Sequence, residues 1–115
     1  MSAVITFPRP PIEIAFTPRN EELIRVGLKR ATTRRSQHGK IGDTFRAAGR
    51  SWEIRSVVRM PLWQVSQLFF LLEGEPSPEY FVLEWGRCYG VEPVQLNQAV
   101  YVHIFVEAPG VYRAP

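Results

Sequence analysis

Strand-like and helix-like segments follow each other in this chain in an order that a repeated βαβ array cannot have. Alternating polar and apolar residues, with β-branched residues concentrated in the last segment, predict strands at 12–16, 44–47, 51–59 and 99–107. Capping residues and helical spacing predict a short helix that Asn20 caps and Gly27 ends, a second from Pro61 to about Leu72, and a third that starts at Ser77 and ends at Gly90. Two successive helices between strands favour an α+β protein. We expect a small, mostly antiparallel β-barrel with helices covering its ends or one side.

The length of 115 residues corresponds to one domain. We expect a lead-in at residues 1–11, the domain at 12–107 and a tail at 108–115. No stretch approaches the roughly 18 consecutive apolar residues of a membrane span, and prolines interrupt the N-terminus where a secretory leader needs an apolar run. A cytoplasmic protein that does not contact membranes is therefore the expectation.

The chain has one cysteine, Cys88, and two histidines, His38 and His103. One cysteine excludes an internal disulfide framework, and the three residues together are too few for a Cys/His zinc site. We therefore expect no metal and no cofactor. Cys88 in its apolar helix and His103 within its strand are interpreted as structural residues, whereas His38 beside Gly39 is expected to be exposed.

Charge is distributed unevenly along the chain. Residues 19–59 contain 11 Lys or Arg and four acidic residues, whereas residues 60–115 contain two Arg and six Glu. Twelve of the 14 basic residues are Arg, the side chain that binds phosphate bidentately and stacks on bases. The basic half is typical of contact with nucleic acid or a nucleotide. A solvated face, or ion pairs between the two halves, is the structural alternative.

Residues 27–34 form the pattern G-x-K-x-x-T-x-R, which places Lys29, Thr32 and Arg34 at fixed spacing. This pattern resembles the signature of the ASCH domain, a branch of the PUA-like superfamily. Its setting is similar as well, with Gly-Asp-Thr-Phe at 42–45, Trp-Glu-Ile at 52–54, Ser-Pro-Glu-Tyr-Phe at 77–81 and Tyr-Val-His-Ile-Phe at 101–105. The resemblance covers residues 12–107 and implies a PUA-like β-barrel with flanking helices.

The resemblance also implies two kinds of function. ASCH domains are proposed RNA-binding modules, and some branches are reported to hydrolyse RNA or to deacylate modified cytidine. In the deacylating branch the Lys and Thr of the motif act with a downstream Glu, and these correspond here to Lys29, Thr32 and Glu73. Glu75 is the alternative for the third position.

The chemistry of such a site depends on which side chains converge. If the segment bends at Ala31, Lys29 and Thr32 converge, and if it is extended, Thr33 lies on the side of Lys29. If burial keeps the lysine neutral, it can accept the hydroxyl proton of Thr32, and the Thr32 oxygen then attacks an acyl group. Glu73 would transfer the proton that the leaving group needs. The structural alternatives are a surface charge for the lysine, a cap or strand role for the threonine, and a helix-end or ion-pairing role for the glutamate.

Five basic residues are candidates to hold phosphates: Lys29, Arg30, Arg34, Arg35 and Lys40. They line one cleft if the loop from residue 28 to residue 40 borders it, and otherwise form a solvated loop. Four aromatic side chains can stack on bases, although core packing is the more frequent role of a tryptophan. They are Trp52, Trp63, Tyr80 and Trp85.

The leading hypothesis is therefore a domain that binds RNA, a nucleotide or a nucleoside in a basic cleft around the motif. The rival is a small hydrolase that uses Lys29, Thr32 and Glu73, either an amidohydrolase on a modified nucleoside such as acylated cytidine or a ribonuclease. A third possibility is an interaction module without nucleic acid. The sequence leaves the ligand and the oligomeric state open.

Overall fold

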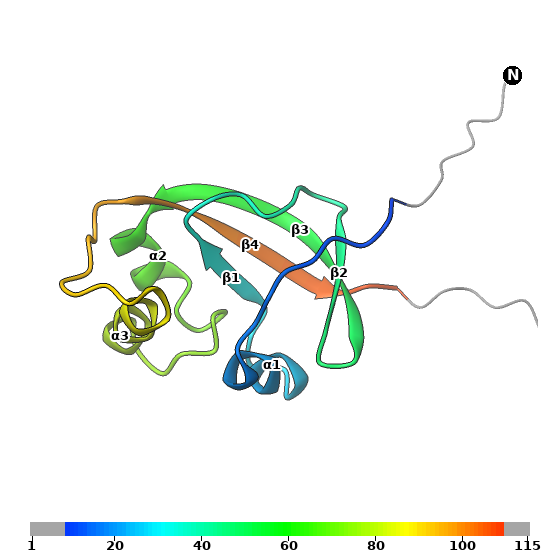
Figure 1. The fold of residues 1–115 in the computed structure, drawn as a ribbon, viewed down its shortest axis with the longest axis horizontal. Helices are drawn as coiled ribbons and strands as arrows, with labels where there is room; N and C mark the ends of the chain where they lie inside the picture. Colours follow the sequence, from blue (N-terminus) through cyan, green and yellow to red (C-terminus); the bar gives the residue numbers. More distant parts are fainter. Residues whose placement is uncertain (1–8, 110–115) are drawn as a thin grey trace, which may run out of the picture.

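The computed structural model describes residues 9–109, in which a curled four-stranded antiparallel sheet is flanked by three helices (Figure 1). Its strands are β1 (Ala31–Arg34), β2 (Thr44–Ala47), β3 (Arg50–Pro61) and β4 (Ala99–Glu107). Their order is β1-β4-β3-β2, so β1 and β2 are the two edges and the sheet forms half a barrel. This confirms the predicted α+β class. Residues 1–8 and 110–115, which make up most of the expected lead-in and tail, lie outside the described residues.

The helices are α1 (Pro18–Arg25), α2 (Leu62–Leu68) and α3 (Pro78–Tyr89). The predicted caps of α3 are confirmed, because the Ser77 hydroxyl accepts the N–H of Tyr80 at 3.1 Å and Gly90 ends the helix with a φ of 64°. Within residues 9–109, no helix has both the length and the apolar character that a membrane span needs.

Each face of the sheet has its own hydrophobic core. One core contains Phe45, Trp52 and Phe105 and is closed by α1 and the segment before it. The other contains Leu62 and Trp85 and lies beneath α2 and α3. Helices therefore pack against both faces of the sheet, α1 on one and α2 with α3 on the other, and the edge strand β1 lies between these helical layers (Figure 1).

The strand predicted at 12–16 is wrong. Only an isolated bridge forms there, between Ile12 and Phe45, with the Ile12 N–H donating to the Thr44 carbonyl at 2.8 Å. The alternating pattern instead reflects burial, since Ile14 packs into the first core. Prolines flank the segment, and their lack of an N–H disfavours a longer ladder.

The start of α1 also differs from the prediction. Thr17, rather than Asn20, is the N-cap, and its hydroxyl accepts the N–H of Asn20 at 3.2 Å. Pro18 then occupies the first helical position, where its missing N–H costs nothing. Gly27 follows the end of this helix with a φ of 88°, as expected of a terminating glycine.

The helix predicted from Pro61 to Leu72 ends at Leu68. The helix ends early because the Leu72 carbonyl accepts the N–H groups of Arg30 and Ala31, at the start of the edge strand β1, at 2.6 and 3.0 Å. The chain must leave the helix to make these bonds. A turn therefore brings the residues after α2 against the start of β1.

Candidate functional site

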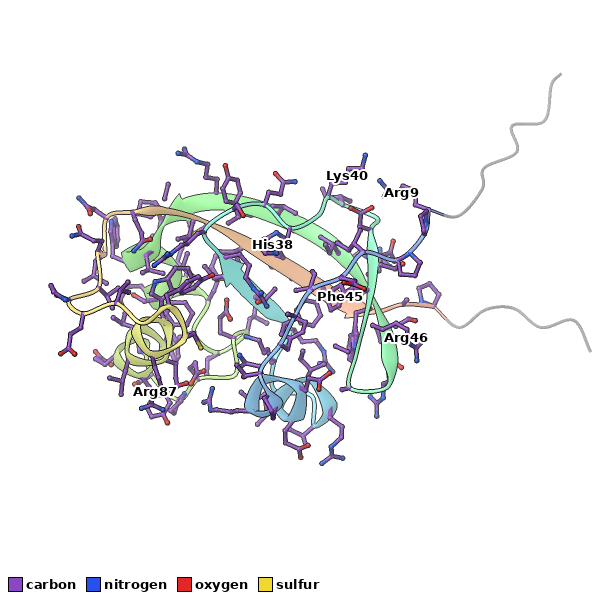
Figure 2. All side chains as sticks on the ribbon, viewed as in Figure 1. Arg9, His38, Lys40, Phe45, Arg46 and Arg87 are labelled. Atoms are coloured by element: carbon purple, nitrogen blue, oxygen red, sulfur yellow. The ribbon has the colours of Figure 1, made fainter. Side chains whose placement is uncertain are left out.

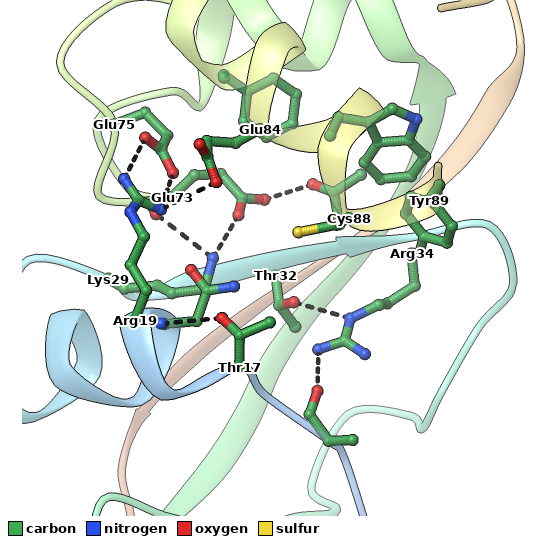
Figure 3. Close-up of a pocket in the computed structure, with 15 residues that line it drawn as sticks. Thr17, Arg19, Lys29, Thr32, Arg34, Glu73, Glu75, Glu84, Cys88 and Tyr89 are labelled. Carbon is green, nitrogen blue, oxygen red and sulfur yellow. Dashed lines mark hydrogen bonds and ion pairs between the residues drawn. The ribbon is translucent and has the colours of Figure 1, made fainter. Parts of the chain in front are cut away.

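A cavity of about 250 Å³ lies between β1, the turn that follows α2, and α3 (Figure 3). Six charged side chains line it: Arg19, Lys29, Arg34, Glu73, Glu75 and Glu84. Other lining residues include Thr17, Thr32, Thr33, Trp85, Cys88 and Tyr89. Three cations and three carboxylates balance, so the expected basic cleft is wrong for this pocket. The alternative of ion pairs between the basic and the acidic halves of the chain applies here.

The floor of the pocket is a buried ion pair between Lys29 and Glu73, which are only 4% and 3% exposed. Lys29 Nζ lies 2.7 Å from Glu73 Oε2 and also donates to the Glu73 carbonyl at 3.4 Å. The hydroxyl of Thr33 donates to the other carboxylate oxygen, Glu73 Oε1. Each Glu73 oxygen thus has a donor, as a charged group buried this deeply requires.

The extended alternative for the motif is the one observed. Alternation along the strand places Lys29 and Thr33 on one side and Thr32 with Arg34 on the other. Thr32 Oγ1 accepts a hydrogen bond from Arg34 Nε at 3.0 Å and still lines the pocket, because β1 is an edge strand. The hydroxyl that bonds to Glu73 is therefore that of Thr33. Thr32, which the resemblance indicated for this role, bonds to Arg34.

Gly74 explains how Glu73 reaches Lys29. Its φ is 82°, and a Cβ atom there would lie 3.2 Å from Leu23 Cδ1 and 3.4 Å from Lys29 Cβ. Only glycine combines this backbone conformation with such a close approach at little cost. The turn therefore packs directly against the lysine stem.

Glu75 also lies in the pocket, and its partner is Arg19. The two side chains form a bidentate pair with both N···O distances at 2.8 Å, and Glu84 lies 3.8 Å from the same guanidinium. The hydrogen bonds that Arg19 donates to Glu75 raise the pKa of Arg19, against the opposing effect of burial. Both carboxylates that the sequence left as alternatives thus face the cavity, each with its own cation.

Arg34 forms the opposite wall of the pocket (Figure 3). Its Nη2 donates to the Ala15 carbonyl at 2.7 Å, and its guanidinium lies over the Phe16 ring at 5.1 Å. Burial lowers its pKa, while the attraction of Tyr89 and Glu73 opposes that shift. The guanidinium is held rigidly, since both the strand and the segment before α1 bind it.

The other predicted phosphate ligands do not line this pocket. Arg30 points toward the core that contains Trp52, where it donates to the Lys29 carbonyl at 2.9 Å and its guanidinium lies 4.6 Å above the Trp52 ring. Arg35 is exposed beside the pocket, with its guanidinium 4.2 Å above the ring of Tyr89, a lining residue. Lys40 is exposed on the loop before β2. Two of the five candidates, Lys29 and Arg34, therefore belong to the pocket.

The aromatic candidates divide in the same way. Trp52 and Trp85 are buried, whereas Trp63 is half exposed and Tyr80 lies beneath the guanidinium of Arg19. Trp85 lines the pocket together with Tyr89, and their ring centroids are 4.3 Å apart. These two rings form an aromatic part of the cavity wall.

His103 is structural, as predicted. It is fully buried, its Nε2 accepts the backbone N–H of His38 at 2.9 Å, and its Nδ1 lies 3.1 Å from the Thr32 carbonyl. These partners require a neutral ring protonated on Nδ1. Burial lowers the pKa of His103 accordingly. Cys88 differs from the prediction, since it is exposed and lines the pocket.

Two charged site residues escaped the sequence analysis: Arg19 and Glu84. A signal existed for Glu84, because it lies within the apolar stripe of α3 that contains Phe81 and Trp85, where an acidic residue needs a partner. Arg19 offered no comparable signal. Among residues 9–109, no group of three or more His, Cys, Asp or Glu side chains is arranged to hold a metal ion.

No protein-family model matches this sequence, and no curated protein matches it. Solved structures do match. An ASCH domain from Lactobacillus crispatus JV V101 has a TM-score of 0.63 at 18% identity, covering 82% of this chain and 75% of that one. The protein EF3133 from Enterococcus faecalis V583, described with the family model DUF984, has a TM-score of 0.60 at 21% identity, covering 78% of this chain and 67% of that one. This chain has the fold of an ASCH domain.

Proposed function

We propose that the pocket binds one nucleoside unit, either a free nucleoside or an unpaired nucleotide of RNA. The balance of charge in the pocket is the observation that carries this proposal. A phosphate inside would meet the three carboxylates Glu73, Glu75 and Glu84 as well as the three cations. A nucleobase and ribose are neutral and present both donors and acceptors, which carboxylates and cations can bind at once.

The shape and walls of the pocket support the same ligand. Its volume of about 250 Å³ suits a small, flat molecule, being slightly below the range of drug-sized sites. Trp85 and Tyr89 line the pocket, and aromatic side chains are common contacts of a nucleobase. The Lys29–Glu73 pair at the floor offers charged groups to the base edge, where hydrogen bonds to charged partners discriminate strongly.

The single cysteine provides a direct test. Cys88 is exposed and lines the pocket, so an alkylating reagent such as N-ethylmaleimide reports occupancy of the cavity. Bound nucleoside should slow the alkylation of Cys88, measured by mass spectrometry across a panel of plain and acylated nucleosides. Ribose 5-phosphate is the matched ligand without a base and should not protect. An unchanged alkylation rate with every nucleoside would reject the proposal.

Hydrolysis of an acylated nucleoside is the second candidate function. The observation that favours it is the Glu73 carboxylate, which accepts hydrogen bonds from the Thr33 hydroxyl and from Lys29. In such a reaction the Thr33 proton passes to Glu73 while Oγ1 attacks the acyl carbon. When the C–N bond breaks, the proton moves to the departing amine, and water then hydrolyses the acyl-threonine ester. Lys29 stabilises the negative charge that develops on the carbonyl oxygen.

Two threonine variants separate this chemistry from binding alone. If Thr33 is the nucleophile, Thr33→Val abolishes deacylation, whereas Thr32→Val, the neighbouring change of equal size, leaves turnover largely intact. The reverse result would assign the attack to Thr32. Product formation is followed by mass spectrometry with acylated cytidine and an RNA pool as substrates. Protection of Cys88 without any product would leave binding as the function.

A further inference from the structure

A second hollow, of about 470 Å³, lies on the sheet, and its lining has a net positive charge, unlike that of the pocket. It is formed by β3, β4 and the loop before β2, and we call it the open-face groove. Its lining residues are Gln37, Lys40, Ile41, Val57, Arg59 and Tyr101. Two cations and no carboxylate line it within the described part of the chain. The open-face groove is therefore a place where phosphate groups meet no opposing charge.

The strand register connects the open-face groove to the pocket. Tyr101 on β4 lies opposite Arg34 on β1 and opposite Arg59 on β3. Side chains of directly opposed residues project to the same face of a sheet. Neighbouring strands are about 4.8 Å apart, so the Cα atoms of Arg34 and Arg59 are separated by about 10 Å. A row of alternating cation, aromatic ring and cation thus runs from the pocket wall into the groove.

The loop that closes the groove is held in place by its backbone. The N–H of His38 donates to buried His103 at 2.9 Å, and the N–H of Lys40 donates to Asp43 Oδ2 at 2.9 Å. The side chain of Lys40 itself remains exposed (Figure 2). Because the backbone is already held, the loop loses little further backbone freedom on binding a partner, which favours affinity.

We infer that the open-face groove binds the single-stranded RNA that flanks a nucleotide held in the pocket. This inference rests on the proposed function and narrows its ligand from free nucleosides to a polynucleotide. Tyr101 supplies the stacking surface for a neighbouring base, and Lys40 and Arg59 bind the phosphates on either side of it. Interleaved cations and aromatic rings are the general means of binding single strands without sequence preference.

The test compares two double variants that remove equal charge from exposed positions. Lys40→Ala/Arg59→Ala removes the cations of the groove, and Arg46→Ala/Arg50→Ala removes two exposed arginines from the β2–β3 hairpin, neither of which lines the groove. Affinity for a labelled, short single-stranded RNA of mixed sequence is measured across a salt series. The groove variant should bind at least tenfold more weakly at low salt, and its salt slope should fall by about 1.4, which corresponds to two phosphate contacts on a single strand. The hairpin variant should change little.

Tyr101→Leu should weaken RNA binding roughly tenfold without changing the salt slope, because it removes stacking and no charge. Equal RNA affinities in the groove and hairpin variants would overturn the inference, as would wild-type protein that binds no RNA or binds the RNA duplex as tightly as the single strand. Failure of the proposed function has a different signature: nucleosides fail to protect Cys88, while RNA binding still depends on Lys40 and Arg59. Protection of Cys88 that persists in the groove variant, together with loss of RNA affinity, supports both sites.

Discussion

The pocket and the open-face groove both take a lysine from the basic half of the chain, and they place it in opposite environments. Lys29 is 4% exposed and bound to Glu73, whereas the side chain of Lys40 is exposed, and among residues 9–109 only the backbone groups of Lys40 have hydrogen-bond partners. Within the pocket, carboxylates of the protein neutralise Lys29 and Arg19. In the groove, no carboxylate is among the described residues that line it beside Lys40 and Arg59. We therefore expect the same residue type to support polar recognition in one region and phosphate binding in the other.

This difference also predicts opposite consequences for stability. A buried charge that loses its partner pays the full cost of desolvation, while an exposed charge that is removed alters little. The stability effects should therefore decrease from the floor of the pocket towards the groove.

The largest effect is expected for Glu73→Gln. It leaves the ammonium of Lys29 buried without a carboxylate, and we expect the free energy of unfolding to fall by about 3–5 kcal/mol in urea titrations. Replacing both partners, as Lys29→Met/Glu73→Leu, should restore most of that loss, because no unpaired charge remains. If Glu73→Gln were as stable as wild type, the Lys29–Glu73 pair would be solvated, and the two lysines of the pocket and the groove would not differ in environment.

Gly74→Ala tests the turn that brings Glu73 to Lys29. The alanine must adopt a φ of 82° and meets Leu23 Cδ1 at 3.2 Å, so we expect a loss of about 2 kcal/mol. Gly49→Ala is the matched control, with a φ of 74° and no heavy atom within 4 Å of the new Cβ. It should cost about 1 kcal/mol. Equal losses in thermal or urea unfolding would show that packing against the lysine stem contributes nothing.

The pH dependence of stability tests the junction between the two regions, where His103 joins the Thr32 carbonyl to the groove loop. Burial lowers the pKa of His103 in the folded state, and burial with the nearby Arg34 lowers that of His38. As the pH falls, these histidines therefore bind protons in the unfolded chain before they do so in the folded protein. The free energy of unfolding should decrease once the pH drops below about 6.5 and continue to decrease until the folded pKa values are passed. Urea titrations from about pH 7.5 to about pH 5.5 should show this decline. His103→Asn should flatten it relative to wild type, and an unchanged slope would exclude this histidine as its source.

The smallest effect is expected for Lys40→Ala and Arg59→Ala. Both side chains are exposed, and each substitution should change the free energy of unfolding by no more than about 0.5 kcal/mol. Their RNA affinity should nevertheless fall, which separates a binding role from a structural one. A loss of several kcal/mol in either variant would mean that the groove is part of the folded framework.

Local signals in the sequence were sufficient for most of the fold. The strand at 99–107 and the caps of α3 at Ser77 and Gly90 are where the sequence predicts them, because alternation and capping involve residues that are close in the chain. The resemblance carried by residues 27–34 led to the right fold and to a lysine that does line the pocket. Ile14 shows the limit, since its burial produces the pattern of a strand without strand pairing.

The composition of the pocket was decided by tertiary structure. The partners Lys29 and Glu73 are 44 residues apart, and Arg19 and Glu75 are 56 residues apart, so no local pattern selects them. Thr33, and not Thr32, bonds to Glu73 because the segment is extended, and the sequence alone did not decide between an extended and a bent segment. The early end of α2 follows from hydrogen bonds to the start of β1. Capping and periodicity are properties of neighbouring residues and can be recognised in the chain. Burial and ion pairing depend on which distant segments the fold brings together, and only the folded chain determines that.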